Sequence, residues 1–477
     1  MFPQTRAECQ RDVYHLKVII VGNGKVGFTL AEHLSKEDHD VTIVDTDFAT
    51  LKKASDTLDV MCIKGNGASV STLQEAGAAA ADVVIAATDL DEINMVCCLT
   101  AKRMGAKYVI ARIRNAEYTV GQASLKKELG IDLVINPEQA TAVEISRLLR
   151  FPTAANIETF YRGRVDLVGF RLQESDFLAG KTLGSLSHKL RSLPILFCAV
   201  ERGEQVFIPN GNSELTAGDL VYMIGEPVGV NQFFRALGRY MHKIRKVFIT
   251  GGGRITYYLA VILEKLGQQI KIVECNEDRC RHLAEILPRS LIICGDGTDQ
   301  ELLESENLSS NDAFVALTDR DEYNLIISLY AAQQGVPKVV AKTNRQNYIG
   351  IARSVGLDSV ISPKLITSNH ILQVVRGMKN SKGSVMKSLY KIAGNRVEAM
   401  EFVVNATTRH LDVPLKDLRL KKGILIAVII HNNKIIIPEG SSSISEGDSV
   451  IIVSRDSGIL DINDIYADGF TAGGGEA

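Results

Sequence analysis

One sequence pattern occurs twice in this chain of 477 residues, and the second copy follows the first after 229 or 230 positions. KVIIVGNGKVG, which begins at Lys17, returns as KVFITGGGRIT at Lys246. VIAATDLDEIN at Val84 returns as FVALTDRDEYN at Phe314, and ARIRNAEY returns as AKTNRQNY. Because a repeat of this length reports a repeated structural unit, we predict that the chain folds as two versions of one module.

The first copy begins with the order of elements that is typical of dinucleotide binding. An apolar run is followed by Gly22-Asn23-Gly24-Lys25-Val26-Gly27, a helical pattern, a second apolar run and Asp45. In such a turn the first glycine permits the tight bend, the second lets the backbone approach a pyrophosphate, and the third lets helix pack on strand. The helix N-terminus offers free N–H groups to the phosphates. Thr46 stands where an NADP site often carries Arg, which favours NAD or another adenine nucleotide.

Four loops of the first copy should meet in one crevice, because the carboxyl ends of parallel strands lie at one edge of a sheet. They are residues 22–27, 45–47, 65–67 and 88–89, and we expect Arg112 on the fifth strand to reach the same place. Asn66 has two interpretations, an amide for an adenine edge or a plain turn. Lys25 likewise is either a phosphate contact or a solvated lysine.

The second copy differs from the first at three informative positions. Thr256 replaces the third glycine, Glu274 replaces Asp45, and Lys342 replaces Arg112. A threonine makes close packing of helix on strand harder, whereas a glutamate can still bind a ribose. We therefore predict a second nucleotide site that is altered by these changes.

Each copy continues with an acidic run, at Asp89–Glu92 and Asp319–Glu322. Such runs can hold a metal ion, but each here precedes a predicted helix. We interpret them as N-capping and first-turn acids, not as metal ligands.

The alternating strands and helices predict an α/β fold with two tandem Rossmann-like, doubly wound parallel sheets. A smaller α+β pattern follows each copy, with Gly218-Asp219 and Gly447-Asp448 before its last strand. We expect Asn380–Asn395 to be a linker. The predicted divisions are an N-terminal extension at 1–15, lobes at 16–150, 151–240, 241–380 and 381–463, and a tail at 464–477.

Composition excludes several classes of function. The formal net charge of −2 gives no basic footprint for nucleic acid, and the longest aliphatic run, Ile424–Ile430, is far shorter than the 20 or so residues of a membrane span. The polar first residues do not resemble a signal peptide, and the eight cysteines contain no CxxC pair, so we expect a reducing, cytosolic compartment.

The sequence also offers no recognisable catalyst. The nine histidines show no HExxH or His–Cys spacing, no tyrosine is followed by lysine four residues later, and GxSxG is absent. We therefore expect a protein that is not an enzyme and holds no metal.

The four-lobe order, GNGKVG with VDTD, GNG, TDLDEIN and IARIR, and the two Gly-Asp pairs closely resemble one family. It is the family of peripheral NAD-binding subunits of bacterial Trk potassium uptake systems, whose chains carry two RCK modules. Each module has a nucleotide-binding N-lobe and a small C-lobe. The resemblance extends from Leu16 to about Asp461 and leaves Met1–His15 unexplained.

The resemblance implies regulation instead of turnover. Family members bind NAD(H), and some bind ATP or ADP. They assemble as rings, typically tetramers of two-module chains, on the cytoplasmic face of the cell membrane, and gate a potassium-translocating subunit of the TrkH or TrkG type. The nucleotide-binding residues so implied are Gly22, Asn23, Gly24, Lys25, Val26, Gly27, Asp45, Asn66, Thr88, Asp89 and Arg112 in the first copy. In the second copy they are Gly251, Gly252, Gly253, Arg254, Ile255, Glu274, Asp296, Thr318, Asp319 and Lys342.

Three other functions compete with this one. In the first, the C-lobes themselves are the sensor and bind a small ligand such as a cyclic dinucleotide, although the sequence shows no dense basic cluster there. A soluble NAD-dependent oxidoreductase would need a proton-transfer or hydride-acceptor site. A pure scaffold would carry glycine turns that no longer bind anything.

Overall fold

The computed structural model describes residues 15–115, 118, 128–151, 154–186, 190, 193–239, 244–379, 384–455 and 458–467. The chain divides into two compact units, residues 1–135 and residues 136–477. Residues 1–14 of the predicted extension, and the tail after residue 467, lie outside the described residues. No helix in the described ranges is both long enough and apolar enough to cross a bilayer.

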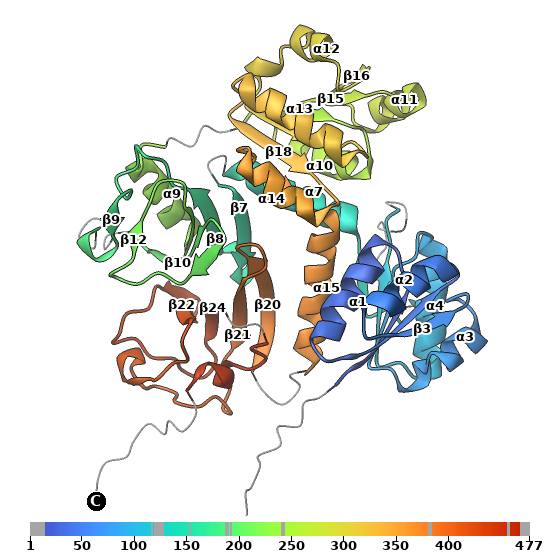
Figure 1. Ribbon diagram of the computed structural model, residues 1–477, viewed down its shortest axis with the longest axis horizontal. Coiled ribbons are helices and arrows are strands. Elements are labelled where there is room, and N and C mark those ends of the chain that lie inside the picture. Colours follow the sequence, from blue (N-terminus) through green and yellow to red (C-terminus); the bar gives the residue numbers. More distant parts are fainter. Residues whose placement is uncertain are drawn as a thin grey trace, which may run out of the picture. The chain divides into compact units, whose positions relative to one another are not determined.

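The first unit is the first N-lobe, a parallel six-stranded sheet of order β3-β2-β1-β4-β5-β6. This is the strand order of a dinucleotide-binding fold, and it confirms the predicted fold class. Figure 1 shows α1 and α4 packed beside this sheet. Its strands are β1 Lys17–Val21, β2 Asp40–Asp45, β3 Met61–Lys64, β4 Val83–Ala86, β5 Tyr108–Arg112 and β6 Leu133–Ile135; its helices are α1 Lys25–Lys36, α2 Phe48–Thr57, α3 Val70–Glu75 and α4 Asp91–Met104.

The second N-lobe repeats this topology as β16-β15-β14-β17-β18-β19. Central strands such as β14 and β17 are apolar and buried on both faces, because helices cover both sides of the sheet. Its strands are β14 Lys246–Thr250, β15 Gln269–Glu274, β16 Ser290–Cys294, β17 Ala313–Ala316, β18 Lys338–Lys342 and β19 Val360–Ile361. Its helices are α10 Arg254–Lys265, α11 Glu277–Ile286, α12 Gln300–Ser305, α13 Asp321–Gln333, α14 Gln346–Ser354 and α15 Pro363–Lys379.

Each C-lobe is a five-stranded antiparallel sheet, and the two sheets have the same topology, β7-β8-β13-β10-β11 and β20-β21-β24-β22-β23. One apolar cluster joins them, with Leu167 and Ile224 of the first sheet and Ala399 and Ile451 of the second. The strands are β7 Asn156–Phe160, β8 Val165–Arg171, β10 Ile195–Arg202, β11 Gln205–Phe207, β13 Leu220–Gly225, β20 Val385–Ile392, β21 Val397–Val403, β22 Ile424–His431, β23 Lys434–Ile436 and β24 Ser449–Ser454. The first C-lobe adds the pair β9 Lys181–Thr182 and β12 Glu214–Leu215, and helix α9 Pro227–Ala236.

Three boundaries differ from the sequence expectation. Helix α7, Pro137–Arg150, was expected to close the first N-lobe, but it packs against α10 and α15 in the second unit. The expected linker Asn380–Asn395 is wrong in its middle, where β20 pairs with β21. The second C-lobe also extends past residue 463, because Ile465 and Tyr466 are buried in its core. In each case the position of the segment depends on tertiary packing, which its local sequence pattern does not specify.

A buried lysine joins the first C-lobe to the second N-lobe. Lys338, at the start of β18, is 4% exposed; its Nζ donates to the Ala154 carbonyl and, over 2.8 Å, to Ser359 Oγ. Beside it, Arg171 Nε donates to Asp358 Oδ1 at 2.8 Å. Burial lowers the pKa of Lys338 to about 7, although the charge of Asp358 raises it.

We predict that this lysine gives stability a pH dependence that Lys338→Met removes. Above pH 7 the folded state loses the proton of Lys338, whereas the unfolded state holds it up to about pH 10.4. The cost of burying the charged lysine therefore disappears, and the free energy of unfolding increases as pH rises from 7. The melting temperature of the parent chain minus that of Lys338→Met should therefore increase between pH 7 and pH 9. Lys271→Met, which changes a partly exposed lysine of the same sheet, should give a constant difference. A constant difference for Lys338→Met as well would contradict the prediction.

Candidate functional site

A cavity of about 510 Å³ lies at the carboxyl ends of β1, β2, β3 and β4 in the first N-lobe. All four loops predicted to meet there contribute to its wall, because the parallel strands end at one edge of the sheet. The residues that line it are Val21, Gly22, Asn23, Gly24, Val44, Asp45, Thr46, Asp47, Thr50, Gly65, Asn66, Gly67, Ala87, Thr88, Asp89, Leu90 and Ile93.

The glycine turn packs as its motif predicts. Gly22 has φ of +100°, a conformation that side chains rarely adopt. A Cβ at Gly27 would lie 1.9 Å from the Gly22 carbonyl oxygen, so helix α1 approaches the turn too closely for any side chain there. A Cβ at Gly24 would meet nothing within 4 Å. Gly24 is also the N-cap residue of α1, so no side chain at the cap competes for the N–H groups of the first turn.

The carboxylate of Asp45 is held at the edge of the cavity by backbone N–H groups. Its Oδ2 accepts from the amide of Asn23 at 2.5 Å, and its Oδ1 accepts from the amide of Asp47 at 2.9 Å. A carboxylate oxygen accepts more than one hydrogen bond, so both atoms retain capacity for a hydroxyl donor. The buried Asn23 side chain donates to the Thr50 carbonyl at 2.7 Å, which fixes the loop against α2.

Asn94, whose role the sequence analysis missed, organises the far wall. It is fully buried; its Oδ1 accepts from the amide and the hydroxyl of Thr88 at 2.9 and 2.7 Å. Its Nδ2 donates to the carbonyls of Thr88 and Arg112 at 3.1 and 2.8 Å. Asn324 makes the same four bonds to Thr318 and Lys342. The repeated spacing T-D-x-D-E-x-N was the available signal.

Four residues predicted for the first site do not line the cavity: Lys25, Val26, Gly27 and Arg112. Gly27 packs directly against the Gly22 carbonyl and supports the turn without facing the cavity. Lys25 is exposed at the start of α1. Arg112 lies behind the wall, with Nη1 3.7 Å from Oδ1 of the exposed Asp89. Asn66 lies in the wall, where its Oδ1 accepts from the amide of Ala68 at 2.9 Å, so both interpretations of this residue remain open.

The acidic run after β4 is partly corrected by the structure. Asp91 and Glu92 lie in the first turn of α4, but the N-cap is Leu90, so no side chain of the run caps the helix. Asp91 Oδ2 instead accepts from the amides of Arg114 and Asn115, each at 2.8 Å. Among the residues that the structure describes, no group of three or more His, Cys, Asp or Glu side chains is arranged to hold a metal ion.

The second copy keeps the same framework with different side chains. Glu274 Oε2 accepts from the amide of Gly252 at 2.6 Å, and Oε1 accepts from the amide of Asn276 at 2.9 Å. Burial raises the pKa of Glu274, but these bonds outweigh it, so the pKa lies below its usual value. Thr256 does not disrupt the turn, because its hydroxyl donates to the Gly251 carbonyl at 2.5 Å. Arg279, which the sequence analysis did not single out, donates from Nε to the Gly252 carbonyl at 2.6 Å.

The remaining residues predicted for the second copy take positions equivalent to the first. Gly251 has φ of +92°, a Cβ at Gly253 would meet nothing within 4 Å, and Arg254 and Ile255 begin helix α10. Asp296 Oδ1 accepts from the amide and hydroxyl of Thr298 at 2.9 and 2.8 Å, and Asp319 is exposed after Thr318.

We predict that Asn94→Ala loosens the cavity wall without unfolding the lobe. Four hydrogen-bonding groups lose their buried partner, a local cost of roughly 2–4 kcal/mol. Hydrogen exchange at the Thr88 amide should become about 30-fold faster or more. Val96→Ala, on the exposed side of α4, should leave that exchange unchanged, and equal protection of Thr88 in both variants would refute the role given to Asn94.

Comparison with known proteins agrees with this architecture. The TrkA-N domain model matches residues 18–137 and 247–363, and the TrkA-C domain model matches residues 167–238 and 399–466. "Trk system potassium uptake protein TrkA homolog 1" of Methanosarcina mazei is 34% identical over 459 residues, which cover 94% of this chain and 100% of the relative. "Trk system potassium uptake protein TrkA" of Halomonas elongata is 33% identical over 462 residues, which cover 96% and 100%.

Solved structures with the same fold are more distant in sequence. The GsuK RCK domain matches with a TM-score of 0.60 at 17% identity, covering 93% of each chain. The GsuK channel bound to NAD matches with the same TM-score and identity, covering 93% of this chain and 77% of that one. The tandem arrangement, the two glycine turns and the full-length relatives together show that this chain belongs to the TrkA family of Trk system potassium uptake proteins.

Proposed function

We propose that this chain is the nucleotide-responsive regulatory subunit of a potassium uptake system, and that NAD(H) binds in the cavity of its first N-lobe. The observation that carries this proposal is the cavity itself, in which an open glycine turn, a helix N-terminus and the Asp45 carboxylate share one wall. Relatives that match nearly the whole chain are named as potassium uptake proteins.

The pyrophosphate and the adenosine ribose of a dinucleotide each have a matching group in the cavity. The pyrophosphate lies against Gly24 and the first N–H groups of α1, where no Cβ obstructs it. Asp45 accepts hydrogen bonds from the adenosine ribose hydroxyls, since its carboxylate is already oriented by two amides. Asn66 and the Thr88–Asp89 loop close the other side. These groups bind and orient a ligand, and we assign them no catalytic step.

Regulation requires that the nucleotide binds two states of the assembly with different affinity. NAD and NADH differ in the charge of the nicotinamide ring, and ATP and ADP, which we propose as alternative ligands, differ by a phosphate that would lie near Gly24 and Lys25. The proposed assembly is a tetrameric ring at the cytoplasmic face of the membrane. Its partner is a potassium-translocating subunit, which the ring gates.

The second N-lobe is proposed as a second, distinct nucleotide site. Glu274 is oriented by the same pair of backbone amides as Asp45, so it retains the capacity to bind a ribose. Arg279 replaces a neutral residue beside the turn and adds a positive charge near that ribose position. We therefore expect the two sites to differ in affinity and in their preference among nucleotides.

Calorimetric titration with NAD, NADH, ATP and ADP tests the proposal, with affinity and sites per chain fitted together. Asp45→Ala should abolish one class of site and leave the assembly intact, because the partly exposed Asp45 carboxylate bonds only to loop amides within the first N-lobe. Glu274→Ala is the matched change in the second lobe and should remove only the other class. Absence of binding at millimolar concentration of all four nucleotides would reject nucleotide regulation.

Gly24→Ala offers a sharper test of where the pyrophosphate lies. Its methyl group meets no protein atom within 4 Å, so the melting temperature should stay within about 1 °C of the parent chain. The same methyl group enters the space assigned to the pyrophosphate, so nucleotide affinity should fall about tenfold or more. Gly253→Ala, the equivalent change in the second lobe, should spare the first site. Unchanged affinity in Gly24→Ala would contradict the assigned position.

A further inference from the structure

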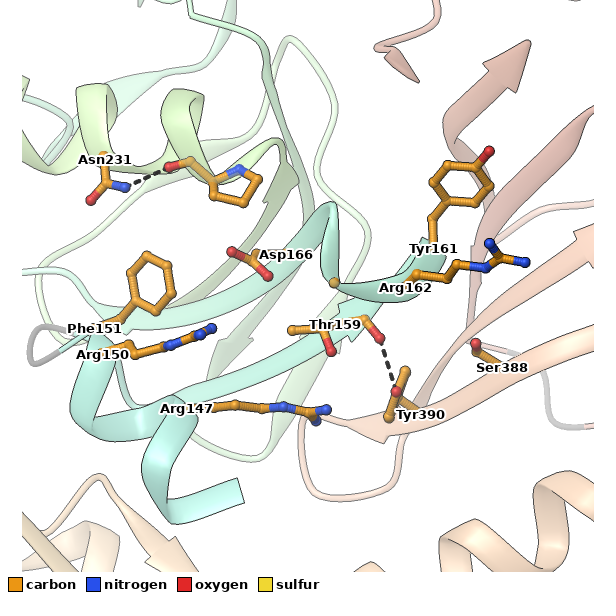
Figure 2. Close-up of a pocket in the computed structure, with 12 residues that line it drawn as sticks. Arg147, Arg150, Phe151, Thr159, Tyr161, Arg162, Asp166, Asn231, Ser388 and Tyr390 are labelled. Carbon is orange, nitrogen blue, oxygen red and sulfur yellow. Dashed lines mark hydrogen bonds between the residues drawn. The ribbon is translucent and has the colours of Figure 1, made fainter. Parts of the chain in front are cut away.

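A second cleft, of about 560 Å³, is lined entirely by residues of the second unit, none of which belongs to a glycine turn. Helix α7, strands β7 and β8 of the first C-lobe, helix α9 and strand β20 of the second C-lobe form its walls. Figure 2 shows Arg147 and Arg150 extending into it from α7, with Arg162 at the opposite end near Ser388. No dense basic cluster is evident in the sequence of the C-lobes. The arginines gather at this cleft because α7 packs beside the C-lobes in the fold.

The guanidinium groups differ in how they are paired. Arg147 Nη1 lies 3.3 Å from Glu144 Oε2. The guanidinium groups of Arg150 and Arg162 form no hydrogen bond, and no ion pair within 4 Å, with any residue of the described ranges. Guanidinium groups bind phosphate and carboxylate oxygens through two parallel N–H donors, and they do so most strongly where water is partly excluded.

A buried carboxyl faces the same cleft. Asp166, on β8, is 4% exposed and lines the cavity, and its carboxylate accepts no hydrogen bond from the described residues. Burial raises its pKa to about 6, although the charges of Arg150 and Arg147 lower it. A buried polar group without a partner costs about 1–3 kcal/mol, so such groups are normally satisfied by a ligand or by water.

We propose that this cleft binds a phosphorylated small molecule, with its phosphate on Arg147 and Arg150 and a hydroxyl or amino group on Asp166. The arginines select the anionic end, and Asp166 selects an organic part that carries a hydrogen-bond donor. The volume lies within the range of small-molecule sites, about 300–1,000 Å³, so a sugar phosphate fits and a bare phosphate leaves Asp166 without a donor.

The position of the cleft gives such a ligand a means of regulation. Tyr390 of β20, which lines the cleft, donates from its hydroxyl to the Thr159 carbonyl of β7 at 2.9 Å, so the two C-lobes meet in its wall. Helix α7 directly follows the first N-lobe in the chain. A ligand that contacts α7 and both C-lobes therefore fixes the helix through which the first N-lobe is attached. This proposal does not depend on nucleotide binding in the N-lobes.

The test is calorimetric titration of the full chain with inorganic phosphate and with ribose 5-phosphate, in 150 mM KCl with NAD present in excess. Arg150→Gln should weaken both probes about tenfold or more, the effect of one lost charge-assisted hydrogen bond. Arg164→Gln is the matched control, because Arg164 is exposed nearby, packs over the Tyr161 ring and does not line the cleft. Asp166→Ala should reduce the preference for ribose 5-phosphate over inorganic phosphate.

Several outcomes would overturn the proposal. They are absence of heat at millimolar concentration of both probes, equal losses in Arg150→Gln and Arg164→Gln, and loss of binding in Asp45→Ala, which would place the phosphate in the first N-lobe. The melting temperature of Arg150→Gln is measured beside that of the parent chain, and this measurement separates lost binding from lost folding.

Discussion

The second unit depends on the burial of one sheet face against another. Each C-lobe sheet has an apolar inner face, and the two inner faces form a single cluster with residues such as Val165 and Ala199 from one lobe and Val397 and Ala427 from the other. A five-stranded sheet with one face exposed would leave this apolar surface in water, at a cost of about 1.5–3 kcal/mol for each large aliphatic side chain. The duplication of the module within one chain therefore supplies each C-lobe with its own partner.

Polar contacts at the edge of this packed face determine how the neighbouring elements attach. The Tyr161 amide donates to Glu401 Oε2 at 3.1 Å, and the Ala393 amide donates to the Tyr222 hydroxyl at 3.2 Å. Arg376 of α15 forms a buried ion pair with Glu398 of β21, with 3.1 Å between Nη1 and Oε2. Removing one member of such a pair leaves an uncompensated buried charge, so loss of either residue weakens the attachment of α15 to β21.

The two N-lobes show which parts of a nucleotide-type site belong to the fold. Both keep a positive-φ glycine, a carboxylate held by two loop amides, and a buried asparagine that ties two strand ends together. The same framework persists although Gly27 corresponds to Thr256 and Asp45 to Glu274. In the second lobe the Thr256 hydroxyl donates to the Gly251 carbonyl, at the place where Gly27 of the first lobe packs closely on the turn. The framework is thus common to both lobes, whereas the side chains added to it differ between them.

Prediction from the sequence succeeded best where the chemistry is local. The glycine turn, the position of Asp45 and the doubly wound parallel sheets follow from periodicity and from residues within one βαβ unit, because parallel strands and their helices are specified over short distances. Asn94 and Arg279 were not identified, because their partners lie on other strands and loops. The strand β20 was taken for a linker, since its apolar pattern is interrupted by Lys387 and Ser388 and only pairing with β21 makes it a strand.

By itself, then, the sequence determined two Rossmann-like lobes, two small α+β lobes and the residues of the first glycine turn. Only the tertiary structure decided that α7 packs with the second unit, that the two C-lobe sheets share one core, and that Arg147, Arg150 and Asp166 border one cleft. The physical reason is sequence separation. Turn geometry and hydrophobic period are encoded within a few residues, whereas the environment of a charge depends on which distant surfaces the apolar faces bury against.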